Sequence, residues 1–193
     1  MKLLFVNACA RKQSRTLQLG RYFLEKYHQC HNDLEIEEIK ICEEENLLPL
    51  NGQRLALREE AIAKKDWHHA MMKYARQWKE ADCIVIAAPY WDWSFPAILK
   101  VYMENIFISD FTFAYEKDGS VGLCQGKKLI YIATAGGDAK SNMGFDYIQR
   151  VAKELGEYEC HYIHASNLDV IGNDVTEILQ NVKKEIDGFV KNC

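Results

Sequence analysis

The feature that most constrains this chain is an uninterrupted run of apolar residues at positions 83–88, which Pro89 ends. A short run with β-branched residues at its centre predicts a strand that is buried on both faces, as in parallel sheets. Similar runs occupy residues 2–6, 128–134 and 160–166. Parallel strands need crossover connections, which are usually helices. The chain is therefore expected to be an α/β protein.

The segments between these strands have helical patterns. Ser14 is a typical N-cap residue, and apolar residues from Leu17 to Tyr27 follow it at near-helical spacing. Residues 34–41 alternate between apolar and charged, which indicates a strand at the sheet edge, and residues 111–120 predict an inserted hairpin. Further helices are predicted at residues 53–80, 96–108, 144–158 and 175–190. The first of these is long for one helix, so two segments or a kink are expected.

This order of elements predicts a flavodoxin-like fold. Five parallel strands in the order 2-1-3-4-5, with helices on both faces and one inserted hairpin, are expected to form a single domain over residues 1–193. In such a sheet the ligand binds beyond the carboxyl ends of the strands. The loops after the first, third and fourth of these five strands meet at that end, so their composition is informative.

The first of the three loops, residues 9–16, has the composition of a phosphate-binding loop. It opens a helix whose first N–H groups lack partners, and Ser14 and Thr16 add hydroxyls to it. Arg11 and Arg15 supply guanidinium groups suited to an anion. A capped helix with a solvated basic loop explains the same residues equally well.

The other two loops are unusual in different ways. Tyr90, Trp91 and Trp93 follow the central strand and offer a wall on which a flat conjugated ring could stack. Gly136 and Gly137 let the backbone approach a ligand closely. Taken alone, the aromatics could cap the core or fill a subunit interface, and the glycines could form a plain turn. All three loops at one end of the sheet favour a binding site.

The order of several short pieces in the second half of the chain points to a known family. The most specific segment runs from Ile84 to Gly137, and its characteristic residues are Pro96, Leu99, Lys100, Tyr102, Phe111, Thr112, Phe113, Tyr115, Gly119, Gly122, Leu123, Gly126, Lys127 and Lys128. With these residues the chain resembles the flavodoxin-like family of FMN-dependent NAD(P)H:quinone reductases and azoreductases. The resemblance covers nearly the whole chain.

The resemblance implies an FMN cofactor, NADH or NADPH as electron donor, a small quinone or azo acceptor, and a homodimer with the flavin sites at its interface. Tyr115 is implied to belong to the substrate pocket. The implied cofactor-binding residues are Cys9, Ser14, Arg15, Thr16, Pro89, Tyr90, Trp91, Asp92, Trp93, Thr134, Ala135, Gly136 and Gly137. The implied reaction is ping-pong: the nicotinamide delivers hydride and leaves, and the acceptor then takes two electrons.

Two positions depart from the family's pattern. Asp92 stands where the family commonly has asparagine, and a carboxylate beside a flavin would disfavour an anionic reduced ring. Cys9 or Ala8 replaces an early loop serine, so a thiol could take over one phosphate hydrogen bond. Because the flavin carries the chemistry, no catalytic nucleophile of the protein is expected.

Composition limits the other functions. Twenty-four basic and 28 acidic residues give a net charge of −4, which provides no electrostatic footprint for nucleic acid or a membrane surface. No apolar run approaches the roughly 20 residues of a membrane span. Seven cysteines, odd in number and scattered, favour a reducing, cytoplasmic setting over a disulfide framework. No metal site is expected, because the adjacent His68 and His69 lack helical ligand spacing.

Besides a general NAD(P)H-dependent FMN reductase, which would also be an enzyme, three alternatives remain open. A flavodoxin-type electron-transfer module would serve a redox protein instead of using NAD(P)H. An iron–sulfur flavoprotein would need a cysteine cluster, which the sequence lacks. A flavin-free relative would have no use for three such loops. Direct oxidation of NADH or NADPH with a quinone, in the absence of a partner protein, would distinguish the first alternative from an enzyme.

Overall fold

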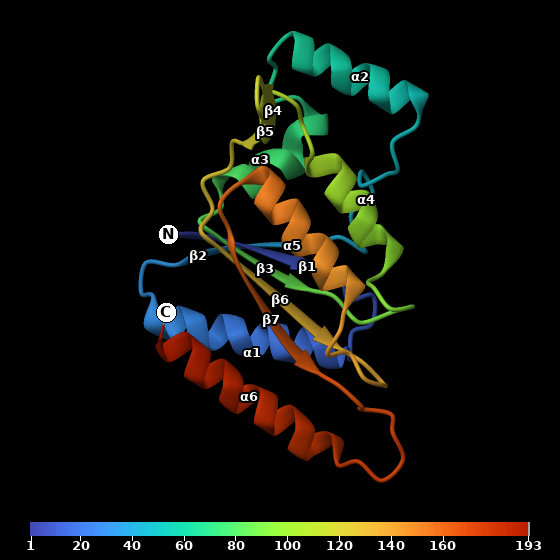
Figure 1. The fold of residues 1–193 in the computed structure, drawn as a ribbon, viewed down its shortest axis with the longest axis vertical. Helices are drawn as coiled ribbons and strands as arrows, with labels where there is room; N and C mark the ends of the chain where they lie inside the picture. The colour runs from blue at the N-terminus through green and yellow to red at the C-terminus, as the bar shows by residue number, and fades with distance from the viewer. Residues whose placement is uncertain (193) are drawn as a thin grey trace.

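The computed structural model describes residues 1–192 and has a five-stranded parallel sheet at its centre (Figure 1). The sheet order is β2-β1-β3-β6-β7, and its strands are β1 Lys2–Asn7, β2 Glu35–Lys40, β3 Cys83–Ala87, β6 Lys128–Thr134 and β7 Glu159–Ala165. The two strands missing from this order, β4 and β5, form a separate hairpin. The predicted order 2-1-3-4-5 and the predicted hairpin are both confirmed.

The register brings the strand ends to one level. Asn7 pairs with Ala87, and Ala87 pairs with Ile132. Backbone bonds continue this alignment into the loops: the Ala8 N–H donates to the Ala87 carbonyl at 2.9 Å, and the Tyr90 N–H donates to the Thr134 carbonyl at 3.0 Å. The loops after β1, β3 and β6 therefore start side by side, as the sequence predicted.

Helices cover both faces of the sheet, and each face has its own core. Along β1, Leu4 and Val6 point into one core and Leu3 and Phe5 into the other, the alternation expected of a strand. Figure 1 shows α3, α4 and α5 on one side of the sheet and α1 and α6 on the other. The helices are α1 Arg15–Cys30, α3 Lys73–Glu80, α4 Ala97–Ile106, α5 Met143–Leu155 and α6 Val175–Lys191.

Helix α1 packs unusually close to the sheet because of Gly20. A Cβ at Gly20 would lie 3.2 Å from both the Ala87 Cβ and the Phe5 ring. Such a contact is tighter than ordinary van der Waals packing, so a larger residue would push the helix outward. Ser14 caps this helix, as predicted, and its hydroxyl accepts from the Leu17 N–H at 3.2 Å. Both features fix the helix N-terminus beside the carboxyl ends of the strands.

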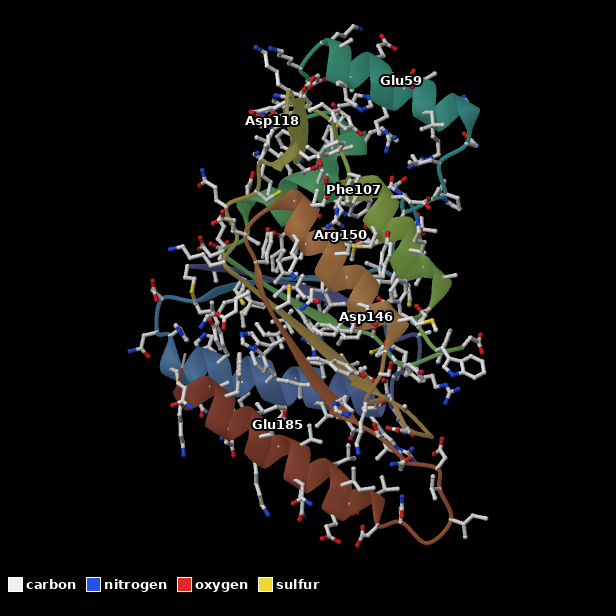
Figure 2. All side chains as sticks on the ribbon, viewed as in Figure 1. Glu59, Phe107, Asp118, Asp146, Arg150 and Glu185 are labelled. Atoms are coloured by element: carbon white, nitrogen blue, oxygen red, sulfur yellow. The ribbon has the colours of Figure 1, made fainter. Side chains whose placement is uncertain are left out.

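The long helical segment predicted at residues 53–80 is two helices, as expected from its length. Helix α2, Gly52–Ala63, is separated from α3 by a turn and a short 3₁₀ segment, Ala70–Met72. In that turn Trp67 stacks on Phe111, with the ring centroids 4.8 Å apart, which fastens the region to the segment before the hairpin. Asp118, in the hairpin turn, lies at the same end of the molecule as Glu59 of α2 (Figure 2).

Two helices are a few residues shorter than the sequence pattern suggested. Helix α4 ends at Ile106 rather than near 108, because the Thr112 hydroxyl binds the Ile106 carbonyl at 2.8 Å and the Ile108 N–H at 2.9 Å. Helix α5 ends at Leu155, and the Cys124 N–H donates to the Leu155 carbonyl at 2.9 Å. Hydrogen bonds from residues outside each helix set both boundaries. Among residues 1–192 there is no helix with the length and apolarity needed to span a bilayer.

Candidate functional site

A cleft of about 420 Å³ lies at the carboxyl ends of the strands. Four loops contribute to it, following β1, β3, β6 and β7. Its lining residues are Cys9, Ala10, Arg11, Gln13, Ser14, Arg15, Thr16, Pro89, Tyr90, Trp91, Thr134, Ala135, Gly136, Leu168 and Asp169. This volume falls within the roughly 300–1,000 Å³ typical of small-molecule and cofactor sites.

One wall of the cleft is the N-terminus of α1, here called the phosphate side and defined as Ser14, Arg15 and Thr16. The first N–H groups of a helix have no intrahelical acceptor, and the helix dipole is positive at this end. Thr16 is fully buried, and its hydroxyl lies 2.7 Å from the Thr134 hydroxyl of β6. That bond ties the helix start to the strand end, so the amide donors are held in place before any anion arrives.

In the glycine loop after β6, the backbone carbonyls are bonded within the described chain, whereas two backbone N–H groups are not. The carbonyls of Ala135, Gly136 and Gly137 accept from the N–H groups of residues 167–169, at distances of 3.1, 3.0 and 2.7 Å respectively. Within residues 1–192, no hydrogen bond uses the N–H groups of Gly136 and Gly137. The loop after β7 thus fixes the glycine loop and leaves two amide donors for a ligand.

The opposite wall ends in a tight reversal at residues 91–94, here called the aromatic turn. Trp91 and Ser94 exchange backbone hydrogen bonds of 3.1 and 2.8 Å, so Asp92 and Trp93 are the two central residues. Both have positive φ, 48° and 63°, as a two-residue hairpin turn requires. A bulky aromatic in this backbone region is strained, by about 1 kcal/mol or more. Trp93 is 70% exposed and Trp91 43% exposed.

Arg15 forms an ion pair across the mouth of the cleft. Its Nη1 lies 2.9 Å from Oδ1 of Asp169, which belongs to the loop after β7. The other oxygen of that carboxylate, Oδ2, lies 2.5 Å from the position that a Cβ on Gly136 would occupy. Gly136 is therefore the residue that leaves room for the Asp169 carboxylate.

Cys9 lies on the cleft floor as a neutral thiol. Its N–H donates to the Asn7 side chain at 3.0 Å, and its Sγ lies 3.5 Å from the Ala87 carbonyl. Burial raises the pKa of the Cys9 thiol to about 11, although the neighbouring Ser14 hydroxyl acts in the opposite direction. A thiol with such a pKa is almost entirely protonated at neutral pH and is a poor nucleophile.

Most of the sequence-predicted site residues come together. The ones that line the cleft are Cys9, Ser14, Arg15, Thr16, Pro89, Tyr90, Trp91, Thr134, Ala135 and Gly136. Asp92, Trp93 and Gly137 lie next to lining residues in the chain but do not line the cleft themselves.

Tyr115 lies apart from the other predicted residues. It is on the hairpin formed by β4, Phe113–Glu116, and β5, Gly119–Gly122, where it is 76% exposed and packs edge-on against Phe113. Figure 1 places this hairpin near α2 and α3, away from the carboxyl ends of the strands. Tyr115 therefore does not reach the cleft of its own chain.

Sequence reasoning missed the contribution of the fourth loop. Leu168 and Asp169 line the cleft, and they follow β7 just as the three predicted loops follow their strands. The rule that ligands bind at the carboxyl ends of the strands applies to this strand too and could have found them. Ala10 and Gln13 were also missed, although they lie within the first predicted loop.

Comparisons with known proteins agree with this architecture. The profile of the Flavodoxin_2 family, described as a flavodoxin-like fold, matches residues 1–189. A protein of Clostridium acetobutylicum named FMN-dependent NADH:quinone oxidoreductase 2 is 37% identical over 188 residues, which cover 93% of each chain. A protein of Caldicellulosiruptor saccharolyticus named FMN-dependent NADH:quinone oxidoreductase is 34% identical over 199 residues, covering 98% of each chain.

Solved structures of similar fold cover the whole length. A crystal structure of an azoreductase from Bacillus anthracis superposes with a TM-score of 0.87, covers 100% of each chain and is 23% identical. The crystal structure of an FMN-dependent NADH-azoreductase from the same species, in complex with FMN, has a TM-score of 0.84 and 26% identity, and the match covers 99% of this chain and 98% of that one.

Proposed function

Because the chain belongs to the Flavodoxin_2 family, we propose that it is an FMN-dependent oxidoreductase that uses NADH to reduce a quinone or azo compound. The observation that carries this proposal is the cleft at the strand ends, in which a helix N-terminus, two aromatic side chains and a glycine loop meet. Relatives named FMN-dependent NADH:quinone oxidoreductases match at 37% and 34% identity over nearly the full chain.

The residues of the cleft fit FMN by their donor chemistry. The phosphate side offers helix N-terminal amides, the Ser14 hydroxyl and the Arg15 guanidinium, which together suit a dianionic phosphate. The unused N–H groups of Gly136, which lines the cleft, and of Gly137, which follows it in the chain, suit the carbonyl and ring-nitrogen acceptors of an isoalloxazine edge. Tyr90 and Trp91 supply flat apolar surface for the ring.

FMN supplies the two-electron redox chemistry when it is bound. The protein's part is to anchor the phosphate, to present amide donors to the ring edge and to leave one region of the cleft open to the nicotinamide and the acceptor in turn. Cys9 remains neutral at physiological pH because of its raised pKa, so it can pack against the ligand or donate a weak hydrogen bond. The proposal assigns no covalent step to it.

A homodimer is part of the proposal. Tyr115 and Trp93 are 76% and 70% exposed, so both aromatic side chains are available to a second copy. Since the hairpin that carries Tyr115 lies away from the carboxyl ends of the strands, and Tyr115 does not line the cleft, a substrate role requires it to reach the cleft of a second copy. A two-fold dimer would cover these side chains and complete both cleft mouths.

Two further points follow from the proposed activity. Residues 1–193 would act as one FMN-binding domain, because all four cleft loops belong to one sheet. A reducing, cytoplasmic setting is supported by Cys9, Cys30, Cys42, Cys124 and Cys160, which form no disulfide.

The testing experiment is a visible absorption spectrum of the purified protein, repeated after anaerobic addition of NADH and then of a quinone. We expect a yellow protein that bleaches with NADH and recovers its colour with the quinone. A colourless protein that also fails to take up added FMN would overturn the proposed function.

The same experiment separates the enzyme from a flavodoxin-type electron-transfer module. A flavodoxin would bind FMN and stay yellow with NADH until a partner reductase was added. Bleaching by NADH alone would therefore exclude the module. NADPH tested in parallel would show which nicotinamide is the better donor, and the names of the relatives lead us to expect NADH.

A further inference from the structure

From the ion pair between Arg15 and Asp169 we infer that Asp169 lowers the preference of the cleft for phosphorylated over unphosphorylated flavin, by competing with the ligand's phosphate for Arg15. This inference rests on the proposed function. It concerns the loop after β7, which the sequence did not assign to the site.

Asp169 differs in charge from the other charged residues that line the cleft. The lining residues of the described chain include two guanidinium groups, Arg11 and Arg15, and one carboxylate, Asp169. That carboxylate is bound to one of the two guanidinium groups at 2.9 Å. Half of the positive side-chain charge available to an anion is therefore engaged within the protein.

The backbone holds Asp169 in this position. Its N–H donates to the Gly136 carbonyl at 3.0 Å, and the preceding Leu168 N–H donates to the Ala135 carbonyl at 3.1 Å. Its carboxylate lies directly over Gly136, where a Cβ would come within 2.5 Å of Oδ2. The loop is thus fastened by its main chain, whereas the carboxylate itself is held by Arg15 and is 70% exposed.

A phosphate dianion at the phosphate side and a carboxylate on Arg15 cannot both be accommodated without cost. Like charges within a few ångströms repel each other, and the Arg15 Nη1 donor that Asp169 occupies cannot at the same time be given to the phosphate. Binding of a phosphorylated ligand would therefore release Asp169 toward solvent, and this release subtracts from the affinity. A ligand without phosphate leaves the ion pair intact and does not meet this cost.

Asp169→Asn tests this competition directly, because the amide keeps the shape of the side chain and the backbone bonds of the loop. The measurement is the Kd of FMN and of riboflavin for the full-length chain freed of bound flavin, from quenching of flavin fluorescence. We expect FMN to bind about fivefold more tightly to the variant, the change that corresponds to one exposed ion pair. Riboflavin affinity should stay unchanged, and Asp169→Glu should restore the wild-type ratio of the two.

Two controls separate the competition from a general change in charge. Asp138→Asn removes an exposed carboxylate four residues after β6 that does not line the cleft, so the ratio of FMN to riboflavin affinity should not change. In an Arg15→Gln background, Asp169→Asn should lose most of its effect, since the guanidinium for which the two anions compete is gone. High ionic strength should shrink the effect, because the Debye length falls to about 3 Å at 1 M salt.

Three outcomes would contradict the inference or the proposed function. Unchanged or weaker FMN binding in Asp169→Asn, or equal tightening of riboflavin, would overturn the competition while leaving the proposed function intact. An effect that persists fully in the Arg15→Gln background would also overturn it. Failure of the wild-type chain to bind either flavin would instead overturn the proposed function, and the inference with it.

Discussion

The two walls of the cleft are prepared for a ligand to different degrees. On the phosphate side, Ser14 caps α1, Thr16 is bonded to Thr134 and Arg15 is paired with Asp169. The aromatic turn has only the reciprocal backbone bonds of Trp91 and Ser94, and it places Trp93 in a strained conformation that is largely exposed. One wall is therefore stabilised by the fold itself, whereas the other holds a conformation that costs stability.

The two walls illustrate two ways in which a protein can hold a cofactor, one that also stabilises the fold and one that costs stability. Groups that serve both the fold and the ligand lower both stability and affinity when they are removed. Strained groups that serve only the ligand raise stability and lower affinity when they are replaced, because the strain is released. The two walls can therefore be told apart by measuring the free energy of unfolding and the Kd of FMN for the same variants.

Ser14→Ala should have the largest effect, because Ser14 serves both roles. Loss of the helix cap is expected to lower the free energy of unfolding by about 1 kcal/mol. Loss of a hydrogen bond to a charged phosphate should weaken FMN binding by about tenfold or more. Urea denaturation and fluorescence titration measure the two quantities.

The matched control is Asn51→Ala, which removes the N-cap of α2 and should lower stability alone. Equal loss of FMN affinity in both variants would contradict a local role for Ser14.

Trp93→Gly is expected to change the two quantities in opposite directions. Glycine adopts positive φ without strain, so the free energy of unfolding should rise by about 1 kcal/mol. Trp93 adjoins the lining residue Trp91 and would meet FMN only in the proposed dimer, so FMN should bind about fivefold more weakly, the scale of one aromatic contact. Lys65 also has positive φ, 51°, and lies outside the cleft. Lys65→Gly should therefore raise stability without changing the Kd. If Trp93→Gly left FMN affinity unchanged, the aromatic turn would not serve the ring.

The hydroxyl pair of Thr16 and Thr134 should couple the phosphate side to the glycine loop. In a double-mutant cycle with valine at each position, we expect a coupling energy in unfolding of about 1 kcal/mol. Thr176 holds the second position of α6 as Thr16 holds that of α1, but it is exposed. Thr176→Val thus reports the intrinsic cost of valine near a helix start. Strictly additive effects of the Thr16 and Thr134 variants would show that the two loops are held independently.

Cys9→Ala should have the smallest effect on catalysis, with turnover within about twofold of wild type, because FMN rather than the thiol carries the chemistry. Complete loss of turnover with FMN still bound would refute this. The same variant has a pH signature. The folded-state pKa of about 11 exceeds the ordinary value of 9.0, so neutral Cys9 stabilises the fold fully below about pH 9. That contribution disappears as the pH rises through 11, and Cys9→Ala should show a shallower loss of stability over this interval.

Much of the architecture could be predicted because local patterns and global topology agree. The apolar run at 83–88, the N-cap at Ser14 and the hairpin at 111–120 each correspond to an observed element. The ends of α4 and α5 were misplaced by two or three residues, since the side chain of Thr112 and the backbone of Cys124 take the last carbonyls. The bond between Cys124 and Leu155 joins residues whose proximity only the folded chain creates.

Sequence patterns were enough to predict the sheet order and the end of the sheet at which a ligand binds, and the family resemblance completed the set of ten predicted residues that line the cleft. The sheet order and the binding end follow from hydrophobic periodicity, helix caps and the handedness of crossovers, which are properties of short segments. The folded chain was needed to show that Asp169 faces Arg15, that the hairpin carrying Tyr115 lies away from the carboxyl ends of the strands, and that Thr16 bonds Thr134. These contacts join residues separated by up to 154 positions, and no local pattern records which distant side chains the fold brings together.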